Sequence, residues 1–220
     1  MTRCRYLIVG GGMAGASAIK GIREVDAQGE ILAVSAEDVA PYQRPLLSKG
    51  LWKGKSFEKV WMKVEAEGLE LRFGRRVMGI DAAARTASLD DGPGVSFEKA
   101  LIATGSRPRR LPFEDEALLH YRSLADYQRL RALAETGGAF AVVGGGFIGW
   151  EIAAALAMNG KKVWLIFPGP SLGHRLFPRD LSLFLNGFYS GKGIELLPGS
   201  TLAGLRRVGA RLSLGLVGGR

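Results

Sequence analysis

The sequence predicts an α/β fold made of two similar three-layer units. The first observation is an internal repeat, in which Phe140–Gly149 (FAVVGGGFIG) matches Tyr6–Gly15 (YLIVGGGMAG). The second is its context, since each copy runs from an apolar strand through Gly-x-Gly-x-x-Gly into a helix and a second strand. The expected helices and second strands are Ala16–Val25 with Glu30–Val34, and Glu151–Asn159 with Lys162–Phe167. This order is typical of Rossmann-like units.

The glycines of the two motifs explain why this order of elements binds nucleotides. The first glycine permits the tight turn, the second lets a pyrophosphate approach the backbone, and the third packs the helix against the strand. The helix N-terminus then offers free N–H groups to the phosphates. One motif alone is weak evidence, but two copies in the same frame predict two nucleotide-binding units. The glycines concerned are Gly10, Gly12 and Gly15, and Gly144, Gly146 and Gly149.

The two units differ where a dinucleotide site holds its ribose. An acid about 20 residues past the glycines usually accepts from the ribose hydroxyls. Glu37, followed by Asp38, fills this place in the first unit, with a solvated loop acid as the alternative. The second unit has no acid between Val163 and Arg179. Arg175 there favours a 2′-phosphate, with a solvated loop cation as the alternative.

The other elements follow from apolar runs and turn residues. Pro108 and Pro112 mark a linker, and Ser123-x-x-Asp126 is a capping box that begins a helix. Further strands are expected as a small meander at Leu69–Phe73, Val77–Ile80 and Ala87–Leu89, a buried strand within Ala100–Gly105, and runs at 194–197, Leu202–Val208 and Arg211–Val217. Helical spacing of Leu181, Phe184, Leu185, Phe188 and Tyr189 indicates core packing.

Composition excludes several classes of function. The chain has one cysteine and two histidines, so an intrachain redox disulfide is excluded and no metal site is expected. No membrane span is expected either, because glycines and Glu151 interrupt the apolar run 137–158. The start resembles a secretory signal, but the glycine motif explains it better, and we expect a cytoplasmic protein. The net charge of +9 is concentrated after residue 160, and such a basic segment is typical of proteins that bind nucleic acid or an anionic cofactor.

The chain resembles a known family, the FAD-dependent pyridine nucleotide-disulfide oxidoreductases. The resemblance is to the branch of ferredoxin and rubredoxin reductases and apoptosis-inducing-factor-like proteins. The stretches that carry it are VGGGMAG (9–15), PYQRPLLSK (41–49), ALIATGSRP (100–108), YRSL (121–124), VVGGGFIGWE (142–151) and LIFPGPSLGHRLFP (165–178). Taken together, the match with the family covers essentially all 220 residues in the right order.

The resemblance implies a role for individual residues. Lys49 and Glu151 would form a catalytic pair beside the flavin, in which the carboxylate offsets the desolvation of the lysine. The residues implied for FAD are Gly10, Gly12, Met13, Ala14, Gly15, Glu37, Arg44, Lys49, Val77, Ala103, Thr104 and Arg122. Those implied for NAD(P)H are Gly144, Gly145, Gly146, Phe147, Ile148, Gly149 and Arg175. The family's ribose-binding acid falls on Gly169.

The resemblance also implies a division into domains. The first segment of an FAD-binding domain would be 1–112, a linker 113–122 and an NAD(P)-binding domain 123–220. The second unit would be inserted in the first, and both would be incomplete at the C-terminus, since the family continues further. The full-length family form would be a possible homodimer. Whether 220 residues alone retain FAD is left open.

The predicted function is that of a FAD-dependent NAD(P)H oxidoreductase. It would pass electrons from NAD(P)H through FAD to ferredoxin, rubredoxin or a small-molecule acceptor. The alternative is a truncated, inactive nucleotide-binding fragment. A basic DNA-binding protein is a third hypothesis, disfavoured because the basic residues are not interleaved with aromatic ones. The acceptor and the choice between NADH and NADPH stay open.

Overall fold

The computed structural model describes residues 2–209 and 211–218 of the chain. The described residues divide into two units, which we treat separately. Unit 1 is Met1–Arg44 with Ser56–Arg107, and unit 2 is Pro45–Lys55 with Pro108–Arg220. Residues 45–55 therefore belong structurally to the second unit. The domain boundaries at 112 and 122 stay predictions.

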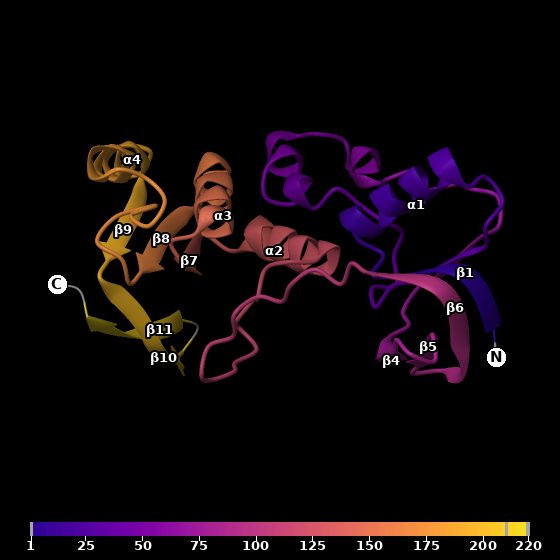
Figure 1. Cartoon of the computed structure of the whole chain (residues 1–220). Coiled ribbons are helices and arrows are strands. Elements are labelled where there is room, and N and C mark those ends of the chain that lie inside the picture. Colours follow the sequence, from indigo (N-terminus) through magenta and orange to yellow (C-terminus); the bar gives the residue numbers. More distant parts are fainter. Residues whose placement is uncertain (1, 210, 219–220) are drawn as a thin grey trace. The chain divides into compact units, whose positions relative to one another are not determined.

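Unit 1 is built on a sheet with the strand order β3-β2-β1-β6-β5-β4. Strands β1, β2, β3 and β6 are paired in parallel, whereas β4, β5 and the start of β6 form an antiparallel meander. Figure 1 shows helix α1 on one side of β1 and β6, with β4 and β5 on the other. The bounds are β1 (Thr2–Val9), α1 (Met13–Val25), β2 (Ile31–Val34), β3 (Leu69–Arg72), β4 (Val77–Asp81), β5 (Thr86–Leu89) and β6 (Gly92–Ile102), with a 3-10 turn at Phe57–Val60.

Alternation along the central strands produces the layers. Ile8 of β1 packs in one cluster with Ile19 of α1. Its neighbours Leu7 and Val9 point to the opposite face and pack with the meander residue Val95. Because successive side chains of a strand face opposite sides, one apolar strand can bury a helix and a meander at once. The predicted α/β fold with Rossmann-like order is confirmed.

Two expectations for unit 1 were wrong. Strand β3 does not belong to the meander but extends the parallel sheet beside β2. The end of β6 is not buried, since Leu101 is 42% and Ile102 67% exposed. Strand β5 pairs with β6 only as far as Ser96, so beyond that residue β6 is paired only with β1 in the described structure.

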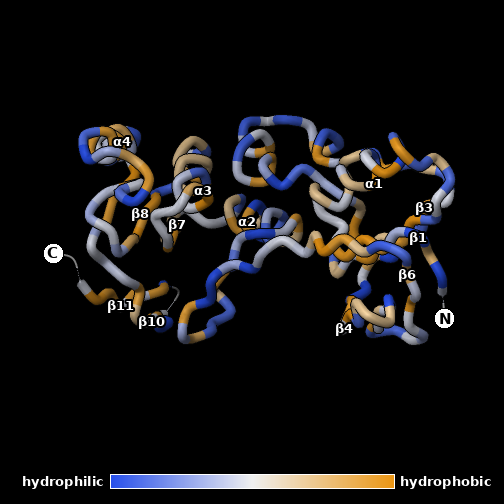
Figure 2. The backbone as a smooth tube through the Cα atoms, in the orientation of Figure 1, coloured by the Kyte–Doolittle hydropathy of each residue, from blue (hydrophilic) through white to orange (hydrophobic). Residues whose placement is uncertain are grey.

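Unit 2 contains a parallel sheet with the order β7-β8-β9 and a separate hairpin, β10-β11. Helices α3 and α4 lie on the same side of the sheet (Figure 1), as two right-handed crossovers in the same direction require. Strand β8 and helix α3 are mostly hydrophobic (Figure 2). The bounds are α2 (Leu124–Thr136), β7 (Ala139–Val143), α3 (Phe147–Met158), β8 (Lys162–Phe167), α4 (Arg179–Gly191), β9 (Ile194–Pro198), β10 (Ser200–Val208) and β11 (Arg211–Gly218), with 3-10 turns at Arg44–Leu46 and Gly50–Lys53.

The local predictions for unit 2 have mixed outcomes. The capping box is confirmed, since the Ser123 hydroxyl accepts from the backbone N–H of Asp126, and the Asp126 carboxylate accepts from the N–H of Ser123. The core stripe on α4 was wrong, because Phe184 is 65% and Phe188 51% exposed and the two rings stack on each other. Helical spacing identifies one face of a helix but not whether another element covers that face.

The described residues give no support for a membrane-spanning helix or for a metal site. Among the described residues, no helix is long and apolar enough to cross a membrane. The described part of the chain also contains no group of three or more His, Cys, Asp or Glu side chains that could hold a metal.

Asp26, at the C-terminal end of α1, gives the first prediction. Its carboxylate accepts from the backbone N–H of Gly29 (2.8 Å) and the hydroxyl of Tyr6 (2.9 Å), and it pairs with Arg5 (2.9 Å). These contacts, the Gly29 N–H foremost, lower the pKa of Asp26 below its usual value of 3.8. A lowered folded pKa means that this stabilisation is present above pH 3.8 and is lost as the pH falls through the folded pKa.

Asp26→Asn should therefore unfold more easily than the wild type at pH 7. The difference in unfolding free energy should shrink progressively below pH 3.8, where the wild-type carboxyl is also neutralised. Urea unfolding of both proteins, at pH 7 and at the lowest pH at which both remain folded, measures this difference in free energy. An equal difference at both pH values would contradict the assignment.

Candidate functional site

The first glycine turn is shaped by close backbone approaches. Gly10 has φ +123°, and a Cβ there would lie 2.2 Å from the carbonyl oxygen of Ala103. A Cβ at Gly15 would lie 2.0 Å from the carbonyl oxygen of Gly10. Both positions therefore require glycine, and the turn brings the backbone of Ala103 and Thr104, just past β6, beside Gly10.

The N-terminus of α1 is open to an anion. Gly12 is its N-cap, and no side chain of the described residues caps it. The nearest heavy atom to a Cβ built on Gly12 is Nη2 of Arg44, at 3.9 Å. Met13 and Ala14, the first helical residues, are exposed. Uncapped N–H groups and a nearby guanidinium are what a pyrophosphate binds.

Glu37, predicted to bind the ribose, lies in a polar cluster. The hydroxyl of Tyr42 donates to Glu37 Oε2 (2.6 Å), Arg44 Nη1 donates to the Tyr42 hydroxyl (2.7 Å), and Arg44 Nη2 pairs with Glu37 Oε1. The Arg44 guanidinium also stacks over the Tyr42 ring at 4.8 Å. Tyr42 was missed by sequence reasoning. Nothing in the sequence around Tyr42 indicated that its side chain would contact Glu37.

The second glycine turn repeats the geometry of the first. Gly144 has φ +126°, and a Cβ at Gly149 would lie 2.0 Å from its carbonyl oxygen. Gly146 is the N-cap of α3, again with no capping side chain among the described residues. No described heavy atom lies within 4 Å of a Cβ built on Gly146. Phe147 and Ile148 follow at 54% and 45% exposure. The sequence repeat is therefore a structural repeat.

Lys49 and Glu151 lie together within unit 2. Lys49 Nζ is 3.1 Å from Glu151 Oε1, and the hydroxyl of Ser48 donates to Glu151 Oε2 (2.6 Å). Ser48 is buried, whereas the Lys49 side chain is 56% exposed. Each carboxylate oxygen of Glu151 thus has a partner among the described residues. Ser48 was also missed, because a serine between a leucine and a lysine has no distinctive pattern.

The segment that carries Lys49 is fixed to unit 2 by several contacts. The carbonyl oxygen of Leu47 accepts from the Tyr121 hydroxyl (2.6 Å) and from Trp52 Nε1 (2.8 Å). The Trp52 ring packs edge-on against Tyr127, with centroids 5.8 Å apart, and its backbone carbonyl accepts from Asn159 (3.3 Å). The position of Lys49 relative to Glu151 is therefore determined by unit 2 itself.

The remaining predicted residues lie in separate places. Val77 begins β4 in unit 1 and is half-buried. Arg122 is half-buried just before the capping box, where its backbone N–H donates to Asp126 (2.9 Å). Arg175 is exposed in the loop between β8 and α4. Val77 packs against the apolar cluster that contains Val9, the last residue of β1 before the first glycine turn.

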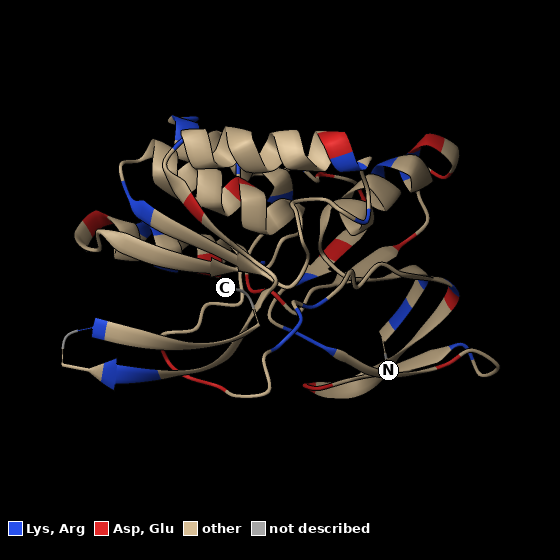
Figure 3. Cartoon of the chain, turned by 90° about the vertical axis from the view of Figure 1, so that its left-hand side faces the viewer, with Lys and Arg blue, Asp and Glu red and all other residues tan. Residues whose placement is uncertain are grey.

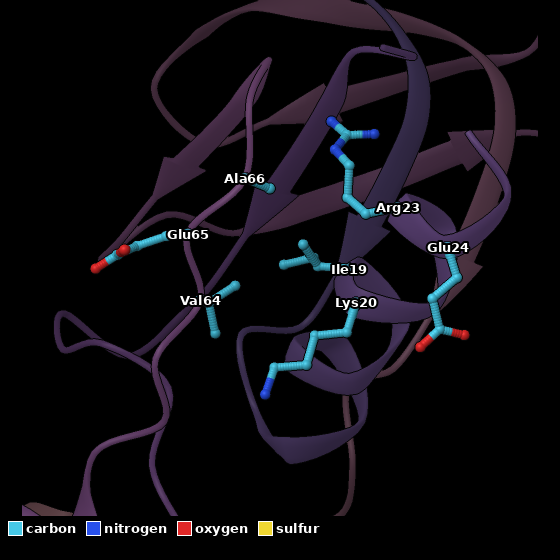
Figure 4. Close-up of a pocket in the computed structure, with 7 residues that line it drawn as sticks. All are labelled: Ile19, Lys20, Arg23, Glu24, Val64, Glu65 and Ala66. Atoms are coloured by element: carbon cyan, nitrogen blue, oxygen red, sulfur yellow. The ribbon is translucent and has the colours of Figure 1, made fainter. Parts of the chain in front are cut away.

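A shallow pocket of about 280 Å³ lies away from these residues, between α1 and the segment 64–66. Figure 4 shows Ile19 and Lys20 of the helix directed toward this segment, whereas Glu24 points away from it. Arg23 donates to the backbone carbonyl oxygens of Asp26 (3.0 Å) and Glu67 (2.6 Å). This guanidinium joins the helix end to the loop, and none of the predicted site residues lines the pocket.

Comparison with known proteins gives consistent relatives. The family described as "Pyridine nucleotide-disulphide oxidoreductase" matches residues 4–217. The chain is 37% identical over 199 residues to a ferredoxin–NAD(+) reductase component of the p-cumate 2,3-dioxygenase system of Pseudomonas putida, covering 87% of this chain and 50% of the relative. It is 31% identical to a putative apoptosis-inducing factor 1 of Drosophila melanogaster, over 97% of this chain and 35% of the relative.

A solved structure gives the same result. The ferredoxin reductase of Rhodopseudomonas palustris superposes with a TM-score of 0.87 at 28% identity, over 96% of this chain and 55% of that one. The chain thus spans about half the length of the proteins it matches.

Proposed function

Since the chain belongs to the pyridine nucleotide-disulphide oxidoreductase family, as its motifs predicted, we propose that it supplies the nucleotide sites of an FAD-dependent NAD(P)H oxidoreductase. The observation that carries the proposal is the pair of uncapped glycine turns of equal geometry, one in each unit. FAD, when bound, would supply the redox chemistry, taking up a hydride and passing electrons to an acceptor, and the protein would bind and orient the reactants.

For FAD we propose unit 1. The α1 N–H groups beyond Gly12 would bind the pyrophosphate, with the Arg44 guanidinium beside them. Glu37 would accept a hydrogen bond from the adenosine ribose. Each carboxylate oxygen can accept two hydrogen bonds, so the contacts with Tyr42 and Arg44 leave an acceptor position for the ribose. Ala103 and Thr104 would line the same turn, the backbone around Val77 would contact the adenine, and Arg122 would be a further FAD-binding residue, as the family resemblance implies.

For the nicotinamide nucleotide we propose unit 2. The α3 N-terminus at Gly146 offers the same uncapped N–H groups, and Gly145 lacks a side chain because a Cβ would lie 2.9 Å from that of Phe167. The exposed Phe147 and Ile148 would contact the ligand's apolar rings. Arg175 would attract a 2′-phosphate.

For Lys49 and Glu151 we propose the catalytic role that the family resemblance implies. The Glu151 carboxylate offsets the desolvation of the Lys49 ammonium when a ligand excludes water from it. The ammonium then stabilises negative charge that develops near it. The buried Ser48 hydroxyl holds the other carboxylate oxygen, so that Glu151 stays directed at Lys49.

For the acceptor we propose an iron–sulfur protein, because relatives are ferredoxin reductases. A small molecule is the second candidate, supported by a monodehydroascorbate reductase of Arabidopsis thaliana at 33% identity. DNA binding has little support. Figure 3 shows Lys and Arg on hairpin β10-β11, but one of these residues, Arg207, pairs with Glu116 (2.5 Å).

The test is whether the protein binds flavin and nicotinamide nucleotide. The purified chain is mixed with FAD, passed through gel filtration, and treated with NADPH or NADH without oxygen. Co-eluting flavin that bleaches supports the oxidoreductase. Nucleotide binding without bleaching supports the inactive fragment, and a chain that binds neither cofactor contradicts the proposal.

A further inference from the structure

The imidazole of His174 lies where the second unit lacks its acid. Gly169 follows two residues after β8, at the end where a dinucleotide site usually places a carboxylate. A Cβ built on Gly169 would lie 2.2 Å from His174 Cε1 and 2.4 Å from Nδ1. The ring thus fills the space that a side chain at 169 would enter. The His174 residue is exposed, so a ligand can reach it.

The loop that carries His174 is anchored at several points. The Gly169 carbonyl oxygen accepts from Gly199 N–H (3.0 Å), and Leu172 N–H donates to the side chain of Asn186 on α4 (2.9 Å). Further along, the Phe177 ring packs against Trp150 of α3, with centroids 6.1 Å apart. These contacts hold the loop to α3, to α4 and to the turn at Gly199.

The hydrogen bond of the ring determines which nitrogen is available. His174 Nδ1 is 3.2 Å from the carbonyl oxygen of Ser171. A carbonyl oxygen only accepts, so Nδ1 carries the hydrogen in this contact. The neutral ring then has a lone pair on Nε2. Neutral histidine in this tautomer is a hydrogen-bond acceptor at the end of β8.

We propose that His174 Nε2 accepts a hydrogen bond from the adenosine 2′-hydroxyl of NAD(H), in place of the missing carboxylate. His174 is then a specificity-determining residue of the second site. The inference rests on the proposed function, which assigns a nicotinamide nucleotide to that site. Unlike a carboxylate, a neutral imidazole does not repel a 2′-phosphate, so NADP(H) can still bind through Arg175.

The test measures dissociation constants of NAD⁺ and NADP⁺ for the 220-residue chain by calorimetry at pH 8, where imidazoles are ordinarily neutral. His174→Ala should weaken NAD⁺ binding about five- to tenfold, as the loss of one hydrogen bond does, and change NADP⁺ binding by less than about twofold. His174→Gln, which keeps an acceptor oxygen, should recover part of the loss. Arg175→Ala, the matched control, should weaken NADP⁺ only.

A second variant tests the position of the ring. Gly169→Ala leaves His174 in the sequence but places a methyl group 2.2 Å from Cε1, so the ring must move. It should weaken NAD⁺ as His174→Ala does, and the double variant should be no weaker than either. Thermal unfolding confirms that each variant is folded; if Gly169→Ala is not, the His174 variants decide alone.

Three results would overturn the inference. They are an unchanged NAD⁺ affinity in His174→Ala, a loss confined to NADP⁺, and an equal loss for both nucleotides. A wild-type chain that binds neither nucleotide would instead overturn the second site itself, and with it the proposed function.

Discussion

Gly146→Asp is expected to weaken NAD⁺ and NADP⁺ binding by about 100-fold or more, while α3 keeps or gains stability. The backbone at Gly146, φ −93° and ψ 174°, is extended, as an N-cap residue requires, and a Cβ there meets no described atom within 4 Å. Aspartate therefore fits. Its carboxylate would accept from the N–H groups of the first turn and repel the pyrophosphate.

The opposite signs of the two effects make this prediction specific. Aspartate is preferred to glycine at an N-cap by a few tenths of a kcal/mol, so the unfolding free energy should not fall. Calorimetric titration and urea unfolding of the same samples measure both effects. Gly146→Asn, which caps without charge, should lose less affinity. Gly149→Ala is the contrast, since its Cβ would lie 2.0 Å from a carbonyl oxygen and should destabilise the unit. Unchanged affinity in Gly146→Asp would show that no phosphate binds at this helix end.

Lys49→Ala is expected to slow flavin reduction by about 100-fold, in a form of the protein that retains flavin. The side chain is more than half exposed and paired with Glu151, so removing it costs little folding energy. FAD affinity should change by less than about fivefold, because the proposed pyrophosphate contacts are in unit 1. Stopped-flow reduction at saturating NADPH measures the rate.

Two further variants separate charge from position. Lys49→Arg keeps the charge and should retain part of the rate. Glu151→Gln removes the countercharge but leaves an amide oxygen to accept from Ser48, and it should also slow reduction. A reduction rate in Lys49→Ala equal to wild type at saturation would remove Lys49 from the catalytic group and leave it a structural ion pair.

The sequence by itself determined the features that depend on local order. The repeat placed both glycine turns, and β8 occupies the predicted residues, Lys162–Phe167. The capping box at Ser123 was equally readable. These features follow from residues near one another in the chain, because turn geometry, helix caps and strand propensity act over a few positions. The family followed from the motifs for the same reason.

Only the tertiary structure decided what depends on distant residues. Residues Leu69–Arg72 form a strand of the parallel sheet because they pair with the edge of β2. Phe184 is exposed because no described element covers that face of α4. Ser48 contacts Glu151 within unit 2 and Tyr42 contacts Glu37 within unit 1, and the first of these pairs joins residues far apart in the chain. His174 filled the space beside Gly169 because its loop turns back on β8. Such contacts depend on which surfaces folding brings together, and no local pattern encodes them.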